Sequence, residues 1–181
     1  MNSVTLRIVI LLVLFRINVD GQVVDSKYPT CDKSLLIGGT VSTSLSINKS
    51  NNSATTIVLV PNIVHFFSSG IGLGLNLNYT LLSVQGSSVV QRAIGPRFML
   101  AFGDEKNRVY PYFGADVNYL NLQVNKNNKS GSLISLYIGI LETLNINVAI
   151  PIQLSITYMG IENSGVTTFS MSAGFVGFFY R

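Results

Sequence analysis

The chain has 181 residues, a length that fits one domain, and it is 48% hydrophobic but only 11% charged. A typical soluble domain is roughly 25% charged, so this sequence lacks the residues that keep a protein of its size in solution. The formal net charge is +4, but the basic residues are scattered, which excludes a nucleic-acid-binding patch. The single cysteine, Cys31, excludes an internal disulfide and is interpreted as a free thiol.

The N-terminus has the pattern of a secretory signal peptide, which we predict at residues 1–21. Arg7 precedes the apolar run IVILLVLF, and compact residues precede an expected cleavage before Gln22. This run is far shorter than the ~20 residues that a membrane helix needs, and an uncleaved anchor is the alternative. No later stretch is long enough for a membrane helix, so any membrane crossing has to use strands.

After a short lead-in at residues 22–33, bulky apolar residues alternate with small or polar ones, which is the period of a strand. The stretch GIGLGLNLNYTLL at residues 70–82 is the clearest case, because Gly, Asn and Thr occupy every second position. In chain order the pattern predicts eight strands, at residues 34–47, 54–67, 70–82, 89–102, 109–124, 132–144, 148–159 and 167–180.

The connections between these strands alternate in length. The segments NKSNNS, SVQGSS, NKNNKSG and GIENSGV are polar and mostly longer, whereas SSG, GDEKNR and NIN are short or turn-like. Long loops on one side and short turns on the other are typical of transmembrane barrels. Nearly all of the predicted strands reach the ~9–11 residues with which a tilted strand spans a bilayer.

The two faces of these strands decide between a membrane barrel and a soluble one. The apolar face carries about five bulky residues per strand, which would overfill an eight-stranded barrel, while small polar residues fit it. We therefore predict an all-β, eight-stranded antiparallel up-and-down transmembrane β-barrel at residues 34–181, with the polar face inside and the apolar face against lipid. A soluble lipocalin-like barrel with reversed faces is the alternative.

Aromatic residues gather near both ends of the predicted strands, as expected for girdles at two membrane interfaces. The predicted girdle at the short-turn end contains Phe67, Phe102, Tyr110, Phe113, Phe179 and Tyr180. The predicted girdle at the long-loop end contains Tyr79, Tyr119, Tyr158 and Phe169.

Several segments, taken in order, resemble the bacterial outer membrane protein beta-barrel domain family of OmpX-like and OmpA-like, porin-family-like barrels. They are VPNIVHFFSSGIGLGLNLNY, GPRFMLAF, YPYFGADVNY, IGILETLNINVAIPIQLSITY and the C-terminal FSMSAGFVGFFYR. The resemblance implies a monomer in a Gram-negative outer membrane, with both termini in the periplasm and outer-membrane lipids and lipopolysaccharide as surroundings. It also implies recognition of the last strand by the barrel assembly machinery, although this chain ends on Arg181. It implies no single activity.

Two charged residues, Arg97 and Asp116, have the inward phase on neighbouring predicted strands. A charge inside a narrow barrel needs a partner, so we expect an ion pair or a polar network. Its other predicted members are Asn76, Asn78, Asn118 and Gln153. One interpretation is a structural plug that fills the interior, and the other is a charged gate on a solute path.

Candidate catalytic and metal-binding residues are few. His65 is the sole histidine, and Ser68, Ser69 and Glu142 show no nucleophile, base and orienter pattern around it. One histidine and one cysteine do not make a usual zinc site, and no phosphate-binding glycine loop is present. We predict no catalytic residue, no metal and no cofactor.

The predicted function is structural or surface-exposed, without enzymatic activity. Lys49, Lys126 and Lys129 lie in the predicted polar outer loops. One interpretation is that these loops bind a host surface or lipopolysaccharide phosphates, and the other is that they are soluble caps with no partner. The alternatives are a narrow pore for small solutes or ions and a lipid-modifying membrane enzyme.

Overall fold

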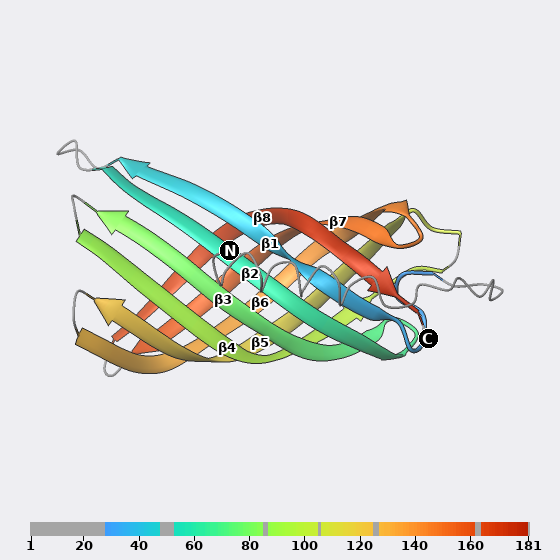
Figure 1. Cartoon of the computed structure of the whole chain (residues 1–181), viewed down its shortest axis with the longest axis horizontal. Helices are drawn as coiled ribbons and strands as arrows, with labels where there is room; N and C mark the ends of the chain where they lie inside the picture. Colours follow the sequence, from blue (N-terminus) through green and yellow to red (C-terminus); the bar gives the residue numbers. More distant parts are fainter. Residues whose placement is uncertain are drawn as a thin grey trace, which may run out of the picture.

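The computed structural model describes residues 28–47, 53–84, 87–104, 106–124, 127–161 and 164–180, so the predicted signal peptide, Lys49 and Lys126 lie outside the described residues. Eight strands form one closed antiparallel barrel in chain order (Figure 1). They are β1 (Leu35–Ile47), β2 (Ser53–Ser68), β3 (Ile71–Val84), β4 (Ser87–Ala101), β5 (Val109–Val124), β6 (Asn127–Asn145), β7 (Val148–Ile161) and β8 (Ser164–Phe179). The predicted fold class is confirmed. The described ranges contain no helix that is long and apolar enough to cross a membrane.

The alternation seen in the sequence becomes the two faces of the wall. On β3, Leu73 and Leu75 are 53% and 54% exposed on the outside, while Asn76 is 2% exposed on the inside. The same phase holds around the barrel, where large apolar side chains of every strand are exposed. A soluble barrel with an apolar interior and a polar coat is therefore excluded, since the exterior is the apolar face.

The strands extend further than predicted at the end of the barrel where β1 ends and β8 begins, here called the far end. β6 begins at Asn127, inside the predicted loop NKNNKSG, and β8 begins at Ser164, inside GIENSGV. Only two residues separate Val84 from Ser87. The predicted asymmetry of loop lengths is wrong, because these polar segments continue the strand ladders as extended hairpins (Figure 1).

The other end, where β1 begins and β8 ends, is here called the terminal end, and its interior is filled by large side chains. This terminal plug consists of Leu36, Val64, Phe66, Met99, Ala101, Tyr110, Tyr112, Tyr137, Leu141, Ala149, Val176 and Phe178. A smaller far-end cluster of Ala93, Leu120, Leu133 and Ile161 lies toward the other end. The expected interior of small polar residues is therefore found only in part of the barrel.

The lead-in packs against the terminal end from Tyr28 onward. The Gly70 amide donates to the Thr30 carbonyl at 2.8 Å, and the Lys33 amide donates to the Phe66 carbonyl at 2.7 Å. Gly70 has a φ of 76°, and a Cβ there would lie 2.2 Å from the Ala101 carbonyl oxygen, so this turn requires glycine. Residues 28–33 of the predicted lead-in thus pack onto the plug.

Candidate functional site

The two inward charges meet in the middle of the barrel. Arg97 on β4 is the cross-strand partner of Asp116 on β5, and Arg97 Nε lies 3.7 Å from Asp116 Oδ1. Their side chains are only 4% and 6% exposed. Alternation aims both side chains into the lumen, and the register sets them opposite each other, so each charge has its counter-ion.

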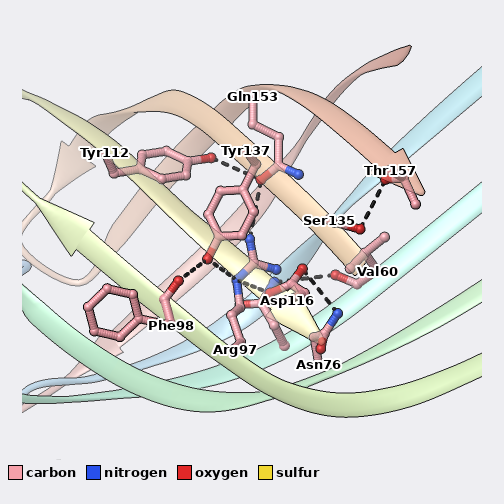
Figure 2. Close-up of polar contacts among 11 residues, drawn as sticks. Val60, Asn76, Arg97, Phe98, Tyr112, Asp116, Ser135, Tyr137, Gln153 and Thr157 are labelled. Carbon is pink, nitrogen blue, oxygen red and sulfur yellow. Dashed lines mark hydrogen bonds and ion pairs between the residues drawn. The ribbon is translucent and has the colours of Figure 1, made fainter. Parts of the chain in front are cut away.

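Tyrosine and glutamine side chains complete the surroundings of the guanidinium (Figure 2). Arg97 Nε donates to the Tyr137 hydroxyl at 3.0 Å, and Nη2 donates to Gln153 Oε1 at 3.3 Å. The guanidinium carbon also lies 4.2 Å from the centre of the Tyr137 ring, a cation–π contact. Tyr112 donates its hydroxyl to the same Gln153 oxygen at 3.2 Å. We call Asn76, Arg97, Tyr112, Asp116, Tyr137 and Gln153 the polar layer.

Two glycines make room for the tyrosines of this layer. Tyr112 is paired with Gly139 across β5 and β6, and Gly114 is paired with Tyr137. A Cβ at Gly139 would lie 2.7 Å from Tyr112 Cζ, and a Cβ at Gly114 would lie 2.4 Å from the Tyr137 hydroxyl. Each ring therefore lies across the glycine of the neighbouring strand, a pairing that locks both rings over the sheet.

The six predicted interior residues do not form one network. Asn76 Nδ2 donates to Asp116 Oδ2 at 3.2 Å, which joins it to the ion pair and Gln153. Asn78 instead accepts a hydrogen bond from Thr80 at 3.0 Å. Asn118 is 2% exposed, and neither its Oδ1 nor its Nδ2 has a hydrogen-bond partner among the described residues.

Tyr112 and Tyr137 are members of the polar layer that sequence reasoning missed. Tyr112 shares the phase of Asp116 on the same strand, so the alternation itself marks it as inward. The same signal applies to Tyr110, whose predicted place in the outer girdle is wrong because its side chain is 1% exposed and lies in the terminal plug. Tyr180 likewise packs against this plug and donates its hydroxyl to the Ile146 carbonyl.

The other predicted girdle residues are exposed or half-buried on the outer side. Phe67, Phe102 and Phe113 are 54%, 54% and 45% exposed near the terminal end, where Phe179 is half-buried. Toward the far end, Tyr119, Tyr158 and Phe169 are 62%, 48% and 75% exposed, and Tyr79 is half-buried.

The candidate catalytic residues are not brought together. His65 is exposed on β2, and Glu142 is on β6, four strands away around the barrel and therefore on its opposite side. Glu142 Oε1 lies 3.8 Å from Arg108 Nη2, and Ser69 hydrogen-bonds Tyr28. Within the described ranges, no group of three or more His, Cys, Asp or Glu residues is placed to hold a metal ion.

Hydrogen bonds within the polar layer compensate for the burial of its two charges. A buried ion pair is stable only when further hydrogen bonds compensate for its lost hydration, as those of Tyr137, Asn76 and Gln153 do here. Arg97 Nη1, Asp116 Oδ1 and Asn76 Oδ1 are buried without a hydrogen-bond partner among the described residues.

Comparisons with known proteins identify the fold. No protein-family model matches the sequence, and no curated protein sequence does. The N-terminal β-barrel domain of Pseudomonas aeruginosa OprF is similar, with a TM-score of 0.57 and 14% identity over 82% of this chain and 98% of that one. Neisserial surface protein A (NspA) has a TM-score of 0.57 and 16% identity, over 80% and 96% of the two chains. The Pseudomonas aeruginosa outer membrane protein OprG has a TM-score of 0.53 and 15% identity, over 87% of this chain and 100% of that one. The fold is that of bacterial outer-membrane barrels.

Proposed function

We propose that this chain is an outer-membrane protein with a structural or surface-exposed role and no enzymatic activity. The apolar exterior supports the membrane location, because lipid contacts the outer face of a membrane barrel. Strand pairing around the barrel supports it too, because paired strands leave no unsatisfied backbone groups in lipid. The expected signal peptide and the fold support export to a Gram-negative outer membrane. In that membrane, lipids and lipopolysaccharide surround the band of exposed apolar side chains.

The observation that carries the non-conducting role is the filled lumen. The terminal plug buries Phe66, Tyr110 and Phe178 to about 1% exposure or less. The polar layer lies against it, with Tyr112 and Tyr137 belonging to both. An eight-stranded barrel has an interior only wide enough for side chains, so this stack of rings and aliphatic groups blocks it.

The extended hairpins at the far end support a surface role. β5 continues to Val124, five residues beyond the exposed Tyr119, and β6 starts from Asn127. In the β5–β6 hairpin, residues 121–131 are mostly Asn, Gln, Lys and Ser, which suit contact with water or with a polar surface. One structural neighbour is named a surface protein, and an adhesive role for these hairpins is the extension of this proposal.

A narrow pore is the second candidate, and the unpartnered buried atoms of Asn118 and Arg97 favour it. Internal water at these atoms would form the middle of a path across the barrel. The terminal plug opposes this, because such a path would have to pass between its packed rings.

The experiment that tests both candidates is refolding of the mature chain into detergent, followed by planar-bilayer recording. We expect a faster-migrating band on SDS gels before boiling, protease resistance and no conductance steps. Discrete conductance from the heat-modifiable form would replace the structural role with the pore. A single band in both lanes, with a chain that is soluble without detergent, would overturn the membrane location itself.

A further inference from the structure

The wall of the barrel is not equally closed at every seam. β5 and β6 pair from Val109↔Glu142 to Val124↔Asn127, along the whole of β5. β1 and β8 pair only from Leu35↔Phe179 to Val41↔Ala173. Beyond that point β1 continues to Ile47 and β8 starts as early as Ser164, so both strands have an unpaired edge toward the far end.

Beyond that point β1 and β8 separate from each other, while each remains paired with its other neighbour. The outer part of β1 remains paired with β2 up to Ile47↔Ser53, and β8 remains paired with β7 up to Ile161↔Ser164. Figure 1 shows the outer parts of β1 and β8 lying apart at the far end, where the two strands have no ladder. Exposure agrees, because residues 165–169 of β8 are all exposed, whichever face they belong to.

The gap begins inside the expected lipid zone. Phe169 belongs to the predicted far-end girdle, and the β1–β8 ladder stops at Ala173, four residues closer to the middle of the barrel. The edge of β8 that points away from β7 at residues 170–172 therefore lacks a strand partner and lies on the hydrocarbon side of the girdle. In lipid an unsatisfied backbone group has no water to bond, so this edge requires a hydrogen-bonding partner.

An apolar hollow of about 620 Å³ adjoins this edge on the outer face. Its sides are two rows of exposed side chains that cross β6, β7 and β8. One row is Leu136, Ile156 and Phe169, and the other is Ile138, Leu154 and Met171. Between the rows lies the backbone around Ser155 and Ser170, so the hollow leads directly to the unpaired stretch of β8.

Polar groups behind the opening are uncharged. Ser155 and Ser170 share a hydrogen bond of 2.7 Å on the inner face, and Ser172 lies one inward position along β8. No charged residue occurs at residues 41–43 or 164–173 or among those that line the hollow. The charges nearest in the lumen, Arg97 and Asp116, are buried against each other.

We propose that the barrel wall has a lateral opening between β1 and β8, and that the adjoining hollow binds an uncharged single-chain amphiphile. The proposal rests on the membrane location proposed above. The hydrocarbon chain lies between the two apolar rows. The head group supplies hydroxyl groups that hydrogen-bond the free strand edges and the serines behind them. A pure hydrocarbon has no such groups, and a charged head group would lose its hydration there at a cost in free energy.

The opening is tested by two double-cysteine variants in a Cys31→Ser background. Val41→Cys and Ala173→Cys place two thiols at directly paired positions that face outward, and we expect them to form a disulfide on oxidation. Thr43→Cys with Met171→Cys lies two residues further along the same strands and does not form one. Equal disulfide yields in the two variants would overturn the opening. An intermolecular disulfide between singly substituted Thr43→Cys and Met171→Cys chains would also overturn the proposal, because a second copy then covers the edges.

Ligand binding is tested by single-tryptophan variants, since the chain has no tryptophan of its own. Met171→Trp and Leu77→Trp each lie two residues inside a girdle aromatic, Phe169 and Tyr79, so they report on similar depths. A brominated monoacylglycerol at low mole fraction in nanodiscs quenches Met171→Trp at least twofold more than Leu77→Trp, whereas brominated phosphatidylcholine quenches both equally.

Equal quenching by the monoacylglycerol would mean ordinary lipid contact and would overturn the site. Every variant is first checked for the heat-modifiable band. Absence of that band from the parent chain would count against the proposed membrane barrel instead of the opening.

Discussion

The terminal half and the far half of this barrel present a similar apolar exterior but have different interiors. Around the terminal end, twelve side chains form one packed cluster that includes Phe66, Tyr110 and Phe178. Toward the far end, the interior is made of Asn, Ser and Thr positions with a cluster of four apolar residues. The exterior is therefore set by the surroundings, while the interior is free to differ along the axis, and the polar layer marks the change.

The largest expected effect comes from breaking that boundary. Asp116→Ala leaves the Arg97 guanidinium buried without its counter-ion, which we expect to lower the free energy of unfolding by about 3–5 kcal/mol. The measurement is urea unfolding of the refolded barrel in detergent micelles. The paired change Arg97→Met with Asp116→Leu removes both charges, and it should recover most of the loss. A double variant as unstable as the single one would mean that the ion pair is not the cause.

The second effect compares the two halves directly. Leu141→Ala removes a side chain that is 1% exposed in the terminal plug, and we expect a loss of about 2–5 kcal/mol because a cavity remains. Ser135→Ala in the far half removes a hydrogen bond to Thr157 of 3.0 Å, for about 0.5–1.5 kcal/mol. The same unfolding assay ranks them, and Leu136→Ala, 61% exposed on the outer face of β6, is the control. Equal losses for Leu141 and Leu136 would contradict a packed terminal interior.

The third effect concerns the tyrosine and glycine pairs of the polar layer. A Cβ at Gly139 would lie 2.7 Å from the Tyr112 ring, so Gly139→Ala forces that ring to move, at about 1–3 kcal/mol. Gly177→Ala is the matched control, because its nearest contact is an ordinary 3.6 Å. The control should be neutral or slightly stabilised in the same assay. A neutral Gly139→Ala would mean that the ring is not held over the glycine.

The strands and their faces could be predicted from the sequence because both follow from a period of two. That period arises because successive side chains of each strand face lipid and the barrel interior in turn. The sequence also brought Arg97 and Asp116 together, since they share the inward phase on neighbouring strands. It misplaced Tyr110 because aromatic type was given more weight than phase.

The remaining differences could not be read from one strand at a time. The polar segments of β6 and β8 look like loops, but cross-strand pairing extends the ladders through them. The early end of the β1–β8 ladder depends on how the sheet closes on itself, which involves residues more than a hundred positions apart, such as Val41 and Ala173.

The smallest effect is expected at the sole histidine. His65 is exposed on the outer face of β2, one strand from the seam that opens at the far end, and its cross-strand neighbours are Leu35 and Leu73. These neighbours supply neither a nucleophile nor an orienting carboxylate. His65→Ala should therefore leave the heat-modifiable band and the lipid composition of an expressing outer membrane unchanged, as judged by mass spectrometry. The empty-vector strain is the control. A change in acyl-chain or head-group composition that appears with the parent chain and disappears with His65→Ala would replace the non-enzymatic role with a lipid-modifying one, located on the wall of the barrel and not in its filled lumen.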